Sequence, residues 1–135
     1  MITFRKIEPQ DLDKIYLNEV LRSLITISSQ GEGFAVVIEE DGAIKGGVSG
    51  YRQGEDAFIQ SVVVLPGLEE DSLLDGLVRS LVYILERDGV QRLFAMGDEN
   101  WYLYERIGFK RFDSQDSDYC LVLDIPSFFE RKTCR

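Results

Sequence analysis

Acid–base chemistry in this chain must rely on Asp, Glu, Tyr, Lys, Cys or a terminus, because none of its 135 residues is histidine. A Ser-His-Asp or Cys-His catalytic site is therefore excluded, and so is a His-ligated zinc. The two cysteines, Cys120 and Cys134, are too few for a thiolate metal site and fit no zinc or redox spacing. The sequence thus predicts a protein without a metal, whose chemistry would use carboxylates, phenols or main-chain groups.

The segment 64–72 is the best candidate for a ligand-binding loop. It joins the most apolar predicted strand, residues 57–65, to the longest predicted helix, residues 72–88. In an open α/β sheet, ligands bind beyond the carboxyl ends of the strands, where free amides at a helix N-terminus can hold an anion. Three consecutive acids at 69–71 stand in this loop. Acids in a first helical turn also complement the helix dipole, so they fit an ordinary helix start as well.

Apolar periodicity predicts the elements that position this loop. The helix 72–88 has a regular apolar stripe, and Ser72 with Asp75 matches a capping box. A weaker stripe over 12–27 fits either one long helix or two short ones. Glycines within the hairpin strand 43–52 indicate a bulge or a close backbone approach. The other predicted elements are a helix over 100–107 and strands over 2–7, 34–38, 90–96, 109–112 and 119–125. This order predicts one α/β domain over residues 1–135, a mixed sheet of six to seven strands with helices on both faces.

Charge and composition restrict the partners. The chain has 24 acidic and 15 basic residues and a net charge of −9, so it should repel nucleic acid and attract cationic partners such as small amines. Residues 2–7 alternate as a strand does and not as a signal peptide, and no apolar run reaches the roughly 18 residues that span a membrane. We therefore expect a cytoplasmic protein without a membrane or nucleic-acid partner. The tail pair Phe128 and Phe129 either packs on the core or forms a homodimer contact.

Two segments resemble the GNAT superfamily of N-acetyltransferases. One is SVVVLP at 61–66, which leads into the long helix. The other is YERIGF at 104–109, which is similar to the Tyr-(Glu)-x-x-Gly-Phe segment of that family. The element order resembles the family over nearly the whole chain. The resemblance implies a GNAT-like fold and the transfer of an acyl group from acetyl-CoA to an amine by direct attack, with no covalent enzyme intermediate.

The resemblance also implies roles for individual residues. The main-chain amides of Val62 and Val64 would polarise the thioester carbonyl. Tyr104, a phenol with an ordinary pKa of about 10, would protonate the departing thiolate. The general base of the family is often a Glu on the strand before the loop, and that position falls near Gln60, whose amide cannot take a proton. The acids at 55–56 are alternative bases that would act through a water.

The phosphate-binding loop of the family, Arg/Gln-x-x-Gly-x-Gly/Ala, is altered in this chain. Counted from Pro66, its positions fall on Glu69, Ser72 and Leu74, so both glycines are replaced and an acid stands at the basic position. A carboxylate about 10 Å from a doubly charged phosphate costs on the order of 1–2 kcal/mol, and Leu74 adds bulk where the main chain should approach. Two hypotheses follow: an N-acetyltransferase with weak acetyl-CoA affinity, or a non-catalytic GNAT-fold module that binds another ligand or a protein.

Overall fold

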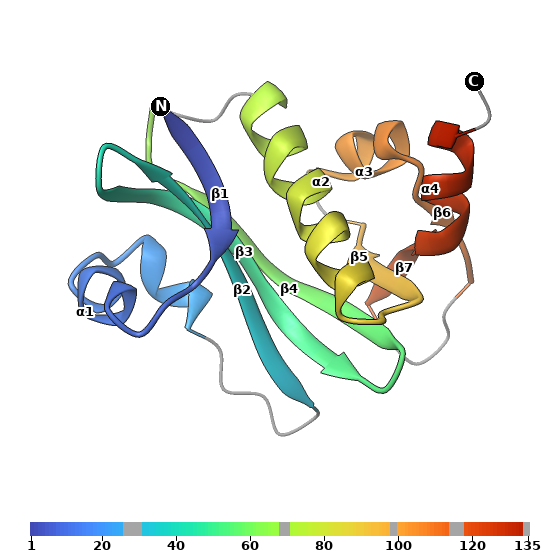
Figure 1. The fold of residues 1–135 in the computed structure, drawn as a ribbon, viewed down its shortest axis with the longest axis horizontal. Coiled ribbons are helices and arrows are strands. Elements are labelled where there is room, and N and C mark those ends of the chain that lie inside the picture. Colours follow the sequence, from blue (N-terminus) through green and yellow to red (C-terminus); the bar gives the residue numbers. More distant parts are fainter. Residues whose placement is uncertain (26–30, 68–70, 98–99, 114–117, 134–135) are drawn as a thin grey trace.

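Seven strands form one mixed sheet in the order β1-β2-β3-β4-β5-β7-β6 (Figure 1). The computed structural model describes residues 1–25, 31–67, 71–97, 100–113 and 118–133. The loop acid Glu69, predicted as a cofactor-site residue, lies outside these ranges. The strands are β1 (Ile2–Lys6), β2 (Glu32–Glu40), β3 (Ala43–Gln53), β4 (Asp56–Val64), β5 (Arg92–Met96), β6 (Lys110–Arg111) and β7 (Tyr119–Asp124). The prediction of a mixed sheet with six to seven strands is confirmed.

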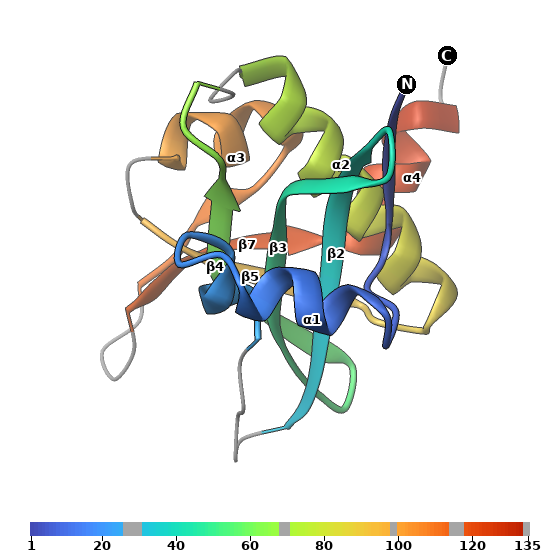
Figure 2. The ribbon, with the colours of Figure 1, turned by 90° about the vertical axis from the view of Figure 1, so that its left-hand side faces the viewer.

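Helices cover both faces of the sheet, as predicted. The long helix α2 (Asp71–Arg87) connects β4 to β5, which are parallel neighbours. Its apolar stripe is buried against one sheet face, on which α3 (Trp101–Ile107) and α4 (Ile125–Thr133) also lie (Figure 1). The short helices α1 (Asp11–Tyr16) and η1 (Leu21–Leu24) cover the opposite face (Figure 2). None of the helices in the described ranges is long and apolar enough to cross a bilayer.

Three local predictions are decided by the structure. The region after β1 forms two short helices and not one long helix. The capping box at Ser72 is wrong: α2 already begins at Asp71, so Ser72 lies inside the first turn, and the Asp75 carboxylate accepts a hydrogen bond from Arg79 at 2.7 Å. The tail forms α4, in which Phe128 is buried in the core.

A bulge in β4 explains the glycine-rich β3. Ser61 pairs with Ser49 and Ile59 with Gly50, so Gln60 is the extra residue of β4. At this point the two backbones approach closely, because a Cβ built on Gly50 would lie against the carbonyl oxygen of Phe58. The prediction of a bulge or close approach at the β3 glycines is therefore confirmed, and the bulge immediately precedes the loop-facing end of β4.

Replacing Gly50 by alanine should destabilise the fold. The new methyl group would clash with a backbone carbonyl that cannot move without disturbing the bulge, and we expect a loss of roughly 1–3 kcal/mol in the free energy of unfolding by urea. Gly97→Ala is the control, because a Cβ there meets the Sγ of Cys120, the end of a side chain that can rotate. Equal stabilities for the two variants would show that the close approach at Gly50 carries no constraint.

Candidate active site

The strands β4 and β5 separate toward their carboxyl ends. Their pairing extends over three residues, from Asp56 with Arg92 to Phe58 with Phe94. Beyond Phe58, no strand of the described part of the chain pairs with this edge of β4. The opening therefore lies directly after the bulge, at the end of β4 that leads into α2.

The amides of Val62 and Val64 face this open edge. The N–H of Leu65 donates to the carbonyl of Lys45 on β3 at 2.9 Å. Successive residues of a strand point their N–H groups to opposite edges, so the N–H groups of Val63 and Leu65 point toward β3. Those of Val62 and Val64 must then point away from β3, where β5 has already separated. The main-chain donors that the sequence predicts for the thioester carbonyl thus have the required direction.

A pocket of about 460 Å³ occupies the opening between β4, α2 and α3. Its walls are both polar and apolar: Asp71, Asn100 and Tyr102 are the polar members, and the apolar members are Val20, Val62, Val63, Val64 and Leu74. Three residues predicted to contact the cofactor, Val62, Val64 and Leu74, therefore meet at one pocket. Ser72 is exposed in the first turn of α2 and does not line it.

The two residues predicted for catalysis are placed outside the lining of this pocket. Gln60 is exposed at the bulge of β4. Tyr104 is 1% exposed, and its ring packs on Phe109 with centroids 5.1 Å apart. The alternative base Asp56 lies at the opposite end of β4, where its carboxylate binds Arg92 at 2.9 and 3.1 Å. The predicted roles of Gln60 and Tyr104 stay predictions.

Sequence reasoning missed Tyr102 and Asp71 as partners in the site. Tyr102 is 41% exposed and lines the pocket, and its hydroxyl donates to the Asp71 carboxylate at 2.7 Å. This hydrogen bond raises the pKa of Tyr102, because the carboxylate opposes a second negative charge on the phenol. A signal was available in the spacing: Leu103, Tyr104 and Ile107 form the buried stripe of α3, which leaves Tyr102 on the other face.

The pocket carries acidic and not basic character. Asp71 is its ionisable carboxylate, and neither Lys nor Arg belongs to its described lining. Within the described ranges, no group of three or more carboxylates and thiols gathers as metal ligands would. A ligand of this pocket would meet the main-chain amides at the end of β4 and a carboxylate at the first turn of α2, which repels anions.

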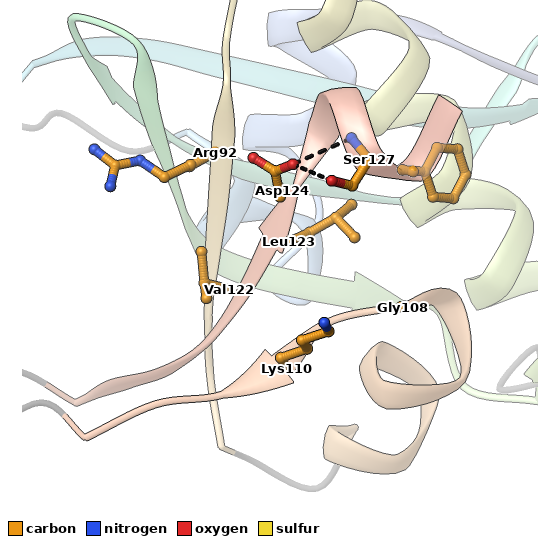
Figure 3. A pocket seen from close by; sticks show the side chains of 8 residues that line it. Arg92, Gly108, Lys110, Val122, Leu123, Asp124 and Ser127 are labelled. Atoms are coloured by element: carbon orange, nitrogen blue, oxygen red, sulfur yellow. Dashed lines mark hydrogen bonds between the residues drawn. The ribbon is translucent and has the colours of Figure 1, made fainter. Parts of the chain in front are cut away.

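A second pocket, of about 210 Å³, lies between β6, β7 and the start of α4 (Figure 3). Val122 and Leu123 contribute apolar wall, and Asp124 accepts hydrogen bonds from the amide and hydroxyl of Ser127. The Asp124 carboxylate is thus engaged in capping α4, and the nearby Arg92 is engaged with Asp56. This arrangement provides a helix cap, and the Asp124 carboxylate and the Arg92 guanidinium are both engaged in structural contacts.

The mixed sheet, the separated parallel strands and the amide-lined pocket after β4 define an acyl-CoA N-acyltransferase type of fold. The sequence profile of the Acetyltransferase (GNAT) family matches residues 2–109. The chain therefore belongs to the GNAT family, and α4 follows the matched region. Among curated proteins, none matches the sequence.

Solved structures share this fold at low sequence identity. The PaiA N-acetyltransferase of Thermoplasma acidophilum, crystallised with coenzyme A, is 14% identical, with a TM-score of 0.72 over 92% of this chain and 99% of its own. The ribosomal-protein alanine N-acetyltransferase of Escherichia coli is 17% identical, with a TM-score of 0.72 over 93% and 94% of the two chains. A GNAT acetyltransferase of Brucella melitensis in complex with acetyl-CoA is 20% identical, with a TM-score of 0.67 over 92% and 88%.

Proposed function

We propose that this protein is an N-acetyltransferase that transfers the acetyl group of acetyl-CoA to a small cationic amine at the open edge of β4. The observation that supports the proposal most directly is the direction of the Val62 and Val64 amides, which point away from β3 at the end of β4 that lines the pocket. An acetyl carbonyl held there gains two donors where negative charge develops during attack. The family and the fold support the same reaction class.

In this reaction the neutral amine attacks the thioester carbonyl directly. β4 itself offers no carboxylate near the bulge that could accept the amine proton, because Gln60 is an amide and Asp56 is bound to Arg92 at the far end of the strand. The acceptor must therefore lose its proton to solvent before it attacks. The acidic character of Asp71 and of the whole surface, with its net charge of −9, favours cationic acceptors during the approach.

The amide donors can be tested with proline, which removes a main-chain N–H. Val62→Pro and Val64→Pro each remove a donor that β3 does not use, so they should lower kcat by roughly 10²–10³-fold and leave most of the stability. Val63→Pro is the matched control, because it removes a donor that bonds to β3 and should chiefly destabilise the sheet. Thiol release from acetyl-CoA measures turnover, and thermal unfolding measures stability. Unchanged turnover in both Val62→Pro and Val64→Pro would contradict the proposed site.

The missing base leads to a pH prediction. We expect kcat/KM for a small amine to rise with pH until the pH reaches the pKa of that amine, without a plateau near neutrality. The chain has no histidine, and Asp71 is the one carboxylate among the described residues that line the pocket. Amines of lower pKa should therefore reach their maximal rate at lower pH. A rate that levels off at the same pH for all amines would reveal a base on the protein instead.

A second candidate function is a non-catalytic GNAT-fold module that binds a cationic ligand or a protein. It is favoured by Asp71, which places a carboxylate at the helix end where the diphosphate of acetyl-CoA would lie. Calorimetric titration separates the two functions: heat at micromolar acetyl-CoA, together with thiol release, supports the enzyme. The absence of binding heat at millimolar acetyl-CoA supports the binding module. The homodimer predicted from Phe128 and Phe129 remains a proposal, and since Phe128 is buried, the dimer would need another contact.

A further inference from the structure

The pocket at the end of β4 reaches both faces of the sheet. Val62 and Val64 pack on the α2 side, whereas Val63 packs with Leu21 and Leu24 of η1 on the opposite side, and all three valines line the pocket. The pocket therefore extends around the edge of β4 to which the Val62 and Val64 amides point. A donor whose diphosphate lies at the start of α2 occupies the α2 side, which leaves the η1 side for the amine.

Val20 lines the η1 side of the pocket together with Val63. It immediately precedes η1, and the α1–η1 segment lies across the face of β4 (Figure 2). The Asn18 side chain accepts hydrogen bonds from the N–H groups of Val20 and Leu21, at 2.9 and 3.3 Å, and Leu21 is buried. The fold therefore holds Val20 in place, and the amine side of the pocket has a fixed apolar wall.

Exposed apolar side chains gather on the segment that carries Val20. Four of the nine large apolar side chains that are exposed in the described part of the chain come from this short stretch: Leu12, Tyr16, Leu17 and Val20. Exposed apolar side chains that cluster, unlike scattered ones, mark binding surfaces. Neither Val20 nor Val63 carries a charge or a polar group, so this wall can hold an apolar part of a ligand and not an ionic one.

We infer that the acceptor is a primary amine that bears an apolar group, and that Val20 and Val63 contact this group. This inference rests on the proposed acetyltransferase function and names its substrate class. The amine nitrogen forms the bond to the acetyl carbon at the edge of β4, the carbon–sulfur bond breaks, coenzyme A leaves as the thiolate, and the proton of the nitrogen goes to solvent. An alkyl or aryl group gains from leaving water at this wall, whereas the second charge of a polyamine would find no partner there.

Three series of primary amines separate apolar from ionic recognition. They are alkylamines from ethyl to hexyl, and amino alcohols and diamines of the same lengths, with thiol release from acetyl-CoA as the measurement and each rate divided by the neutral fraction of the amine. For the alkylamines, kcat/KM should rise roughly two- to fourfold with each added CH2 and exceed that of the amino alcohol of equal length. A diamine series that rises as steeply overturns the inference, because the acidic surface and not the wall would then select the acceptor.

Substitutions at Val20 test whether this wall is the cause of the preference. Val20 is 40% exposed, so the fold should tolerate both Val20→Thr, which replaces a methyl group by a hydroxyl at equal volume, and Val20→Leu, which adds apolar surface. The gain per CH2 should fall in Val20→Thr and rise in Val20→Leu. Ile2→Thr is the matched control, because Ile2 is 45% exposed on β1, three strands from β4, and this variant should keep the wild-type gain.

The outcomes distinguish the inference from the proposed function. If the wild type releases no thiol with any of these amines, the proposed function fails, and the inference fails with it. If the wild type acetylates amines but chain length has no effect, the function stands and the inference alone is overturned. The same gain per CH2 in the wild type, Val20→Thr and Val20→Leu overturns it as well.

Discussion

Replacing Arg5 by methionine should lower the free energy of unfolding by roughly 3 kcal/mol. The Asp11 side chain is only 1% exposed, and both of its oxygens accept hydrogen bonds from the Arg5 guanidinium, at 2.7 and 2.9 Å. Arg5 also binds Glu39 of β2 at 2.6 Å and lies 3.2 Å from Glu8. Without the guanidinium, this buried carboxylate would keep the hydrogen bond from the N–H of Glu8 at 2.8 Å but would lose its cationic partner next to two further acids. The link of α1 to β1 and β2 through Arg5 would also be lost.

Arg111→Met is the matched control for this variant. Arg111 forms one ion pair, with Glu105 at 2.9 Å, and its side chain is 64% exposed. Surface ion pairs contribute at most about 1 kcal/mol, so this variant should unfold close to the wild type. Urea unfolding at neutral pH measures both. A loss for Arg5→Met as small as that for Arg111→Met would mean that water reaches Asp11 and replaces its partner.

The pH dependence of the Arg5 effect has a definite sign. The hydrogen bonds from Arg5 hold the pKa of Asp11 below its ordinary value of 3.8. A depressed carboxyl pKa contributes stability that is present above the ordinary value and is lost as pH falls through the folded pKa. The stability difference between wild type and Arg5→Met should therefore be full at neutral pH and shrink below about pH 4, where Asp11 becomes protonated in the variant and then in the wild type.

The sheet and the long helix were predictable because many apolar positions in the sequence indicate the same element. The apolar stripe of α2 runs from Leu74 to Leu85, and each of its members is buried in the structure. The run over 57–65 is apolar at most positions, which identifies a central strand. It does not show which residues point to which face of the sheet. Ala57, Ile59, Val62 and Val64 pack on the α2 side, so the alternation shifts by one residue at the bulge. An apolar run without contrast between its faces cannot show where such a shift occurs.

The site was less predictable because it depends on which face α3 turns toward the core and on the residue at which α2 begins. Aromatic residues at 101, 102 and 104 give α3 two candidate apolar faces, and the choice is made by packing of Leu103 and Ile107 against the core. The start of α2 at Asp71, one residue before the predicted start, could not be read from the sequence either. It turns the Asp71 carboxylate toward Tyr102, and that contact is what makes the pocket acidic. Val62, Val64 and Leu74, which the family motifs assign to the cofactor, line one pocket, but the motifs could not give its electrostatic character.

Reversing the charge of the loop should strengthen acetyl-CoA binding by roughly 2–3 kcal/mol, about 30- to 150-fold in Kd. The variant is Glu69→Arg with Asp71→Asn, which restores a basic residue at the family position and removes the carboxylate that lines the pocket. Leu74 is retained, because it is 8% exposed in the core and its replacement by glycine would cost several kcal/mol of stability. Calorimetric titration of wild type and variant gives the two dissociation constants directly.

The control for this variant makes the same charge change far from the pocket. Glu86→Arg with Asp13→Asn alters two exposed positions, one near the end of α2 and one in α1. A general effect of net charge on the anionic ligand would appear in both pairs, whereas a local effect appears only in the loop pair. The local gain should also shrink as salt is added, because the Debye length falls from about 10 Å at 0.1 M to about 3 Å at 1 M. Equal affinity in the wild type and the loop variant would mean that the diphosphate does not lie at the start of α2.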